Sequence, residues 1–360
     1  MGESDHNPTP NAPGVSPKRG THLATYRMVV VFACLIVMTA GVGVGSLAIG
    51  TERLGVADVT AAVFGYPTSP VTHAIVVKIR VPRAVLGVLV GAALGAAGAA
   101  YQALFRNPLA DPFVVGASSG AAVGAAIAIV SGWGGWVAGF GPTSLGAFAG
   151  ALLAVLLVYA VAAVGRMPPV TLLLAGSTVS TMLGGVLYLI MTLADKQLHQ
   201  IFAWLMGGLA GHGWDTVAGA WAPIVIGTTV LSLLGRPLDA VCCGEDVARA
   251  LGLRVGGVVA IVLLAANLAV AAAVAAGGVI GFVGLVAPHL ARPLVGAAHA
   301  RLIPASGLIG ATLLLIADCA ARSLVPPLEL PIGVLTAVVG GPIFLIVLRS
   351  KSASAAEGMG

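Results

Sequence analysis

The chain is dominated by apolar runs of about twenty residues, separated by short polar or glycine- and proline-rich connections. The first run, residues 28–49, contains no charged residue. A helix needs about 20 apolar residues to cross the roughly 30 Å hydrocarbon core of a membrane. Because hydrocarbon offers the backbone no hydrogen-bond partners, helices are the simplest way for such runs to cross it. The runs therefore predict an all-α polytopic membrane protein.

The same length criterion predicts about ten transmembrane helices. They cover residues 28–49, 83–105, 113–131, 144–164, 171–193, 216–234, 257–275, 279–297, 303–321 and 331–348. Charged residues make up only 9% of the chain, against about 25% in a typical soluble domain. A soluble core therefore does not account for this sequence.

The ends of the chain differ from its middle. Residues 1–27 are rich in proline, asparagine and serine, and predict a disordered N-terminal tail. Residues 28–349 form the membrane domain, and residues 350–360 form a short C-terminal tail. With the N-terminus inside, twelve of the eighteen Lys and Arg residues fall on the inner side. This bias predicts that both termini are cytoplasmic.

Several classes of function are disfavoured by the sequence. The net charge of +5 is spread too thinly for nucleic-acid binding. The four cysteines form no CxxC pair and no cluster with histidine, so neither a metal site nor a disulfide framework is predicted. No phosphate-binding G-x-x-x-x-G-K-[ST] loop is present. We therefore predict no catalytic residues and no directly bound cofactor, and any ATP used in transport must be hydrolysed by another polypeptide.

The longest charged interruption in the second half of the chain is residues 236–254. Within it, a short amphipathic helix is predicted between two glycines, with acidic residues in its first turn and an arginine near its last. The candidate contact residues are Gly244, Glu245, Asp246, Val247, Ala248, Arg249, Ala250, Leu251 and Gly252. The segment is either an ordinary solvated loop or a surface that contacts a partner outside the membrane.

Two groups of charged residues lie near the predicted outer ends of spans. Arg80 and Arg83 precede the second span, where they are either interface anchors or a docking point for an acidic partner. Asp318 and Arg322 are four residues apart in the ninth span. An intramembrane carboxylate is costly unless paired, and this spacing predicts a structural ion pair.

A proline-rich turn is predicted at the inner end of the second span. Two prolines four residues apart stiffen the connection, and polar side chains flank them. The residues of this candidate cytoplasmic turn or gate are Gln102, Asn107, Pro108, Asp111 and Pro112.

Glycines recur at intervals of four in two of the predicted spans. Gly87, Gly91 and Gly95 form one series, and residues 116, 120 and 124 form the other. Small residues at this spacing allow helices to approach closely in lipid. Residues 116–120 also match G-x-S-x-G, and an intramembrane serine protease with His289 as base is an alternative. That motif is a nucleophile elbow only on a strand-to-helix turn, and no strand is predicted here.

Taken together, the motifs resemble those of FecCD-type permeases. They are RVPR, GxxLGxxGxxYQxxFRNPLADPFVVGxSSGA, LLLAGSTVS, WLMGGL, GEDVARALGLR, GxIGFVGLVAPHLAR, IADCAAR and ELPIG, in the family's order. The resemblance runs from about residue 28 to residue 349. It implies the type II fold of ATP-binding-cassette (ABC) importer permeases, in the cytoplasmic membrane of a prokaryote.

The resemblance also implies partners and roles. A homodimer or a pair of related subunits would enclose the pathway, with two ATPase subunits carrying ATP and Mg below and an extracytoplasmic binding protein above. Arg80, Arg83 and Arg322 match the family's outer arginines that meet this binding protein, and residues 245–251 match its ATPase-coupling helix. Ferric siderophore is the first expected cargo, and cobalamin and haem are the alternatives. The scarcity of buried acids disfavours the other class of transporter, an ion-coupled carrier.

Overall fold

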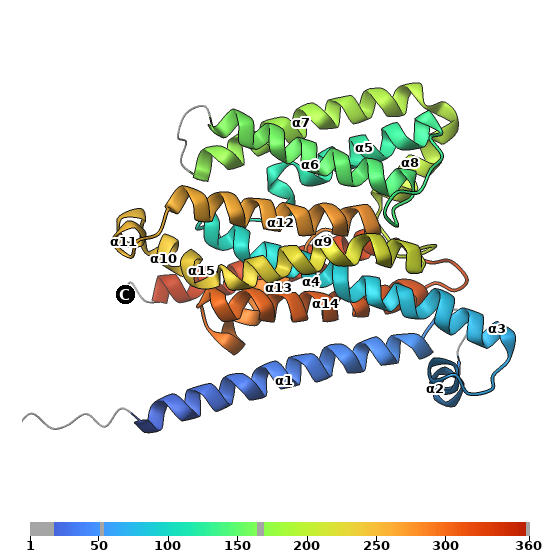
Figure 1. The fold of residues 1–360 in the computed structure, drawn as a ribbon, viewed down its shortest axis with the longest axis horizontal. Coiled ribbons are helices and arrows are strands. Elements are labelled where there is room, and N and C mark those ends of the chain that lie inside the picture. Colours follow the sequence, from blue (N-terminus) through green and yellow to red (C-terminus); the bar gives the residue numbers. More distant parts are fainter. Residues whose placement is uncertain (1–17, 51–53, 164–168, 358–360) are drawn as a thin grey trace, which may run out of the picture.

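The computed structural model describes residues 18–50, 54–163 and 169–357, which form a bundle of long helices without a β-strand (Figure 1). The elements are α1 (Lys18–Ala48), α2 (Val56–Phe64), α3 (Pro70–His73), η1 (Ala74–Arg80, a π-helical stretch), α4 (Val81–Leu104), η2 (Pro112–Val115), α5 (Ala117–Ser131), α6 (Pro142–Ala163), α7 (Pro169–Leu193), η3 (Asp195–Gln197), α8 (Leu198–Leu205), α9 (Trp214–Leu233), α10 (Gly235–Cys243), α11 (Glu245–Ala250), α12 (Val255–Gly277), α13 (Val283–Val295), α14 (His299–Ser323) and α15 (Ile332–Glu357).

The helices confirm the predicted all-α membrane architecture. Seven of the described helical segments are long and apolar enough to span a membrane, and three shorter apolar helices occupy the remaining predicted positions. The shorter ones are α5, α13 and the first part of α15. In Figure 1, α11 lies at one end of the bundle and α3 at the other; we name these the α11 end and the α3 end. α1 begins and α15 finishes at the α11 end.

Several predicted boundaries shift. α1 already begins at Lys18, so residues 18–27 are helical, whereas residues 1–17 lie outside the described part. α15 continues to Glu357, so most of the predicted C-terminal tail is also helical. The second span begins at Pro70 as one continuous helical segment of 35 residues. Ser69 caps this segment by accepting a hydrogen bond from the backbone N–H of Thr72, ahead of a proline in the first turn.

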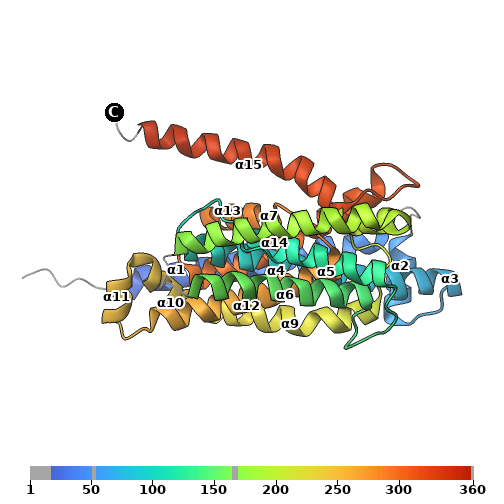
Figure 2. The same ribbon diagram turned by 90° about the horizontal axis from the view of Figure 1, so that it is seen from above.

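The core of the bundle is built on α4. Most of α4, α12 and α14 is buried, whereas only about a tenth of α1 and of α7 is buried, on the outside of the bundle. Figure 2 shows that α15 diverges from the other helices as it runs toward the α11 end. The subunit therefore has a dense centre and three weakly covered helices at its margin.

The four-residue glycine spacing produces very close helix contacts, as predicted. A Cβ placed on Gly91 would lie 2.4 Å from the carbonyl oxygen of Gly310, and one on Gly95 would lie 2.1 Å from that of Ser306. The same occurs between α5 and α6, where a Cβ on Gly124 would lie 2.0 Å from the carbonyl oxygen of Gly146. Gly116 serves another purpose, since its φ of 91° lets the chain turn from η2 into α5.

Gly98 should be among the least replaceable of these glycines. A Cβ there would lie 1.8 Å from the carbonyl oxygen of Gly284 on α13. Gly98→Ala therefore forces backbone to move, and we expect a loss of about 1–3 kcal/mol in stability. Thermal unfolding of the purified protein in detergent measures this loss. Gly41→Ala on α1 is the matched control, because a Cβ at Gly41 meets nothing within 4 Å; an equal loss in both variants would contradict the packing argument.

The predicted eighth span is helical only in its second part. After α12, the chain turns at Gly278 (φ 68°) and runs without helical structure to Phe282 (φ 67°), where α13 begins. Ile280 in this non-helical segment is buried, and the backbone N–H of Gly208 bonds to the carbonyl of Gly277 at 2.8 Å. Non-helical backbone is tolerated at membrane depth where protein covers it or water fills a cavity. Here Gly278 and Ile280 are buried, whereas Val279, Gly281 and Phe282 are half-buried.

Candidate functional site

A cluster of buried charges lies near the α3 end of the bundle. Arg83 on α4 donates from Nε and Nη2 to the same oxygen of Asp318 on α14, both at 2.9 Å. Its Nη1 donates to Glu329, in the segment between α14 and α15, at 2.8 Å. The Arg83 side chain is 7% exposed and that of Asp318 is 2% exposed. A guanidinium this deeply buried requires such charge-assisted partners.

Arg322 and Arg80 complete the cluster. Arg322 lies 3.0 Å from the second oxygen of Asp318, so the predicted i, i+4 pair is present. It also donates to the carbonyl of Ile49 at 2.8 Å, and Arg80 donates to the carbonyl of Leu47 at 2.6 Å. Both arginines therefore hold the C-terminal end of α1 and the residue that follows it.

The geometry refines both interpretations of these arginines. An interface anchor would extend its charged head into the headgroup region, but Arg80, Arg83 and Arg322 are all buried in the subunit. Their docking role stays a prediction. The sequence did not single out Glu329, although it stands in the ELPIG motif and its side chain is 33% exposed.

The α11 end carries the predicted contact helix. α11 covers Glu245–Ala250, and the flanking Gly244 (φ 132°) and Gly252 (φ 78°) adopt backbone angles that favour glycine. Leu251 is the C-cap, so the helix is one residue shorter than predicted. Ala248 faces inward and is fully buried, whereas Val247 and Leu251 are 47% and 66% exposed. An exposed apolar pair on a short, rigidly bounded helix is suited to contact with another protein.

The charged residues of α11 bind one another. Arg249 lies 2.8 Å from Glu245 and 3.6 Å from Asp246, and all three side chains are exposed. Exposed pairs of this kind contribute about 0–1 kcal/mol each. The three charged side chains thus pair with one another on the helix surface. Val247 and Leu251 are the apolar side chains that remain available to contact another protein.

α10 connects α11 to the bundle, and the sequence did not predict it as a helix. Asp239 on α10 accepts hydrogen bonds from the backbone N–H of His299, at 2.9 Å, and contacts its ring Nδ1 at 2.5 Å. The Cys242 thiol donates to the carbonyl of Ala103 at 3.4 Å, and burial raises the pKa of this thiol. α10 is therefore fastened to the α11-end termini of both α4 and α14.

The predicted proline turn lies between α10 and the interior of the bundle. Arg106, in the turn after α4, donates to the carbonyl of Val241 on α10 at 2.7 Å. Asn107 accepts a hydrogen bond from the N–H of Leu109 at 2.9 Å, within the stretch that contains the exposed Pro108. Asp111 caps η2 through the N–H of Phe113 at 2.8 Å, and burial raises the pKa of Asp111 to about 6.

The other two residues of the predicted turn point toward α13. Pro112 packs against Gly284, where an added Cβ would lie 2.6 Å from the proline ring. Gln102 donates to the carbonyl of Leu285 at 3.4 Å and accepts from Arg292 at 3.1 Å. The structure thus connects α10, the turn and α13 in one continuous series of contacts.

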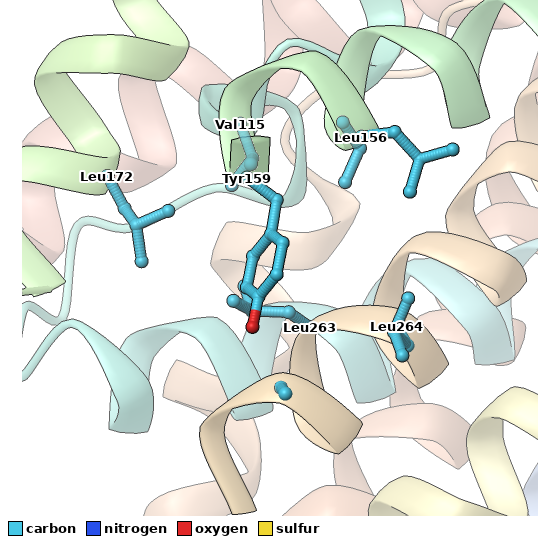
Figure 3. Close-up of a pocket in the computed structure, with 8 residues that line it drawn as sticks. Val115, Leu156, Tyr159, Leu172, Leu263 and Leu264 are labelled. Carbon is cyan, nitrogen blue, oxygen red and sulfur yellow. The ribbon is translucent and has the colours of Figure 1, made fainter. Parts of the chain in front are cut away.

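A small apolar pocket between α6, α7 and α12 is below the usual size of a ligand site. The pocket in Figure 3 has a volume of about 140 Å³ and is apolar except for the Tyr159 hydroxyl. Ligand pockets are commonly about 300–1,000 Å³. The residues around it are Val115, Val155, Leu156, Tyr159, Leu172, Ala260, Leu263 and Leu264. Within the described ranges, no three His, Cys, Asp or Glu side chains are grouped as metal ligands.

The structure does not support the hydrolase alternative for residues 116–120. Gly116 connects a 3₁₀ turn to α5, and the described residues supply no strand for a nucleophile elbow. His289 contacts the carbonyl of Leu285 on its own helix at 2.9 Å.

Comparisons with known proteins agree with this fold. The chain is 41% identical over 210 residues to a cobalamin import system permease protein of Halobacterium salinarum, covering 58% of this chain and 56% of that protein. It is 39% identical over 210 residues to a hemin transport system permease protein of Yersinia pestis, covering 58% of this chain and 63% of that protein. These matches thus span little more than half of each relative.

A solved structure described as an inward-facing conformation of a metal-chelate type ABC transporter is also similar. It matches with a TM-score of 0.79 and 31% sequence identity, over 89% of this chain and 99% of that chain. The family model for the FecCD transport family matches residues 28–350. The resemblance inferred from the motifs is therefore confirmed: the chain belongs to the FecCD transport family.

Proposed function

We propose that this chain is the permease subunit of an ABC importer that moves a metal chelate across the cytoplasmic membrane of a prokaryote. Family membership and the fold shared with a metal-chelate type transporter support this function. The observation that carries it is α11, an exposed helix at one end of a chain whose sequence has no phosphate-binding loop. ATP and Mg belong on two partner ATPase subunits, and α11 receives their movement.

This function assigns an orientation. The α11 end faces the cytoplasm, where twelve of the eighteen Lys and Arg residues gather under the sequence-based topology. The α3 end then faces outward, and the buried Arg80, Arg83 and Arg322 lie beneath the surface where acidic side chains of an extracytoplasmic binding protein would dock. Both termini lie on the cytoplasmic side.

A second subunit, identical or related, completes the pathway. Little of α7 is buried, yet its exposed surface carries Ser177, Thr181 and Gly185 at helical spacing. Hydroxyl and glycine positions are more typical of a helix interface or an aqueous path than of a lipid-facing surface. α7 is therefore the best candidate to line a path between two subunits.

The test is uptake by proteoliposomes that contain the permease, the ATPase subunits and the loaded binding protein. Labelled ferric siderophore, cobalamin and haem are compared; we propose ferric siderophore as the cargo. Uptake must require ATP on the side of α11. Uptake driven by a proton or sodium gradient without ATP would contradict the importer assignment and favour an ion-coupled carrier.

Neutralising the outer arginines should weaken docking. In Arg80→Gln and Arg83→Gln, one positive charge is removed without burying a new negative charge, and we expect weaker capture of the loaded binding protein. The difference should shrink as salt rises from low to physiological concentration, because screening reduces charge attraction. Binding to nanodisc-embedded transporter measures it, with unfolding temperature as the control for folding. Unchanged affinity at low salt would show that these arginines do not contribute to docking.

A further inference from the structure

The two carboxylates that bind Arg83 differ in how firmly they are held. Asp318 projects from the buried helix α14, five residues before its end at Ser323, and also binds Arg322. Glu329 lies in the segment between α14 and α15, and its side chain is 33% exposed. Of the two partners, Glu329 is the one that can leave without breaking the packing of a helix.

The charges of the paired side chains balance only while Glu329 is bound. Arg83 and Arg322 share two carboxylates, Asp318 and Glu329, so these four side chains carry one net positive charge when Glu329 has left. A buried guanidinium that loses its partner is strongly unfavourable unless another acceptor replaces it. Exchange of one carboxylate for another avoids that cost, because Arg83 stays paired throughout.

There is space beside the pair for an entering group. A cavity of about 470 Å³ is lined by both Arg83 and Glu329, together with His212 and the backbone around Gly207. Burial and the nearby Arg83 lower the pKa of His212. Because Arg83 lines this cavity, an acidic side chain that enters it would meet the guanidinium.

We propose that Glu329 is a displaceable internal counter-ion, which occupies on Arg83 the position that an acidic side chain of the docking partner takes on binding. This inference rests on the proposed docking of an extracytoplasmic binding protein at the α3 end. It adds that, in the free permease, Glu329 already occupies the guanidinium that the partner's carboxylate would bind. The partner is recognised only if its carboxylate competes successfully with the one already present.

Backbone hydrogen bonds connect the segment that carries Glu329 to the rest of the bundle. The neighbouring Leu330 donates its N–H to the carbonyl of Ala321 at 3.0 Å, and α15 begins two residues later. The N–H of Gly333 in α15 then bonds to the carbonyl of Gly207 at 3.4 Å. When Glu329 leaves Arg83, the segment that directly precedes α15 therefore loses one of the contacts that hold it in place.

The test compares Glu329→Gln with Asp58→Asn in full transporter complexes in nanodiscs, using the loaded binding protein as the probe. Glutamine has the size of glutamate and still accepts a hydrogen bond, so the fold is retained. In Glu329→Gln, the incoming carboxylate no longer competes with the partly exposed Arg83–Glu329 ion pair. The Kd of the loaded binding protein should therefore fall by about three- to tenfold. Asp58 is an exposed acid on α2 at the same end; its neutralisation should change affinity by less than about twofold.

The outcomes separate this inference from the docking proposal. Tighter binding by Glu329→Gln alone supports the internal counter-ion. If Arg83→Gln weakens binding but Glu329→Gln does not tighten it, docking stands and the counter-ion role is wrong. Equally tighter binding in Glu329→Gln and Asp58→Asn would show that the effect comes from net charge alone, and would also overturn the counter-ion role. If neither arginine variant nor Glu329→Gln changes affinity, both proposals fail.

Discussion

Replacing Val247 and Leu251 together with aspartate is expected to reduce ATP-driven uptake to background while the permease still inserts and folds. These residues are the exposed apolar pair of α11 and do not support the core, whereas the neighbouring Ala248 does. In the proposed complex they lie in a groove of an ATPase subunit. Burying two unpaired carboxylates there costs several kcal/mol. Co-purification of the ATPase subunits and uptake by proteoliposomes measure the loss.

Val56→Asp is the matched control for this experiment. Val56 is also an exposed apolar residue on a short helix, but α2 lies at the opposite end of the bundle. It should leave ATPase co-purification unchanged. Single replacements of Glu245, Asp246 or Arg249 should impair coupling less than the apolar double variant, because these three side chains pair on an exposed surface. Normal uptake by the double variant would show that α11 is not the coupling contact.

The second large effect is expected from Asp318→Ala. Asp318 lies between Arg83 and Arg322, and its removal leaves two buried guanidinium groups without their shared carboxylate. Breaking a buried charge pair on one side typically costs about 3–5 kcal/mol. We expect a marked fall in the unfolding temperature and in the yield of folded protein from membranes.

Asp195→Ala provides the comparison, since Asp195 is an exposed acid in η3, directly before α8, and α8 lies toward the α3 end (Figure 1). It should behave as the wild type. A double variant, Asp318→Ala with Arg322→Leu, should recover part of the lost stability, because one of the uncompensated charges is removed as well. Equal stability of Asp318→Ala and Asp195→Ala would show that the cluster does not hold the helices together.

The fold could be predicted from the sequence because its main signals are local. Apolar runs located the seven helices long enough to span a membrane and the three shorter apolar helices, and the four-residue glycine spacing indicated where helices touch. The signal was weaker where the chain departs from a uniform helix. Gly277 and Gly278 marked a break, but not its extent to Phe282. The helices α2, α8 and α10 are too short to be recognised by the length criterion for a membrane span.

The candidate sites were predictable only in part. The Asp318–Arg322 pair follows from i, i+4 spacing, whereas the Arg83–Asp318 contact joins residues 235 positions apart. No local pattern indicates such a contact. Glu329 is similar, because only the folded chain shows that it reaches Arg83. The glycine-bounded α11 was evident in the sequence, but its fastening through Asp239 and His299 was not.

The glycine contacts also set the mechanical properties of the subunit. Where Gly91 meets Gly310 and Gly98 meets Gly284, the backbones already touch, so α4, α13 and α14 resist compression and move as one stiff unit. α15 diverges from this unit beyond its first turns (Figure 2). α1 and α7 are likewise little buried. We therefore expect a displacement applied at α10 to move α4, α13 and α14 together, and relative motion to arise at the margin of the bundle, as at the start of α15.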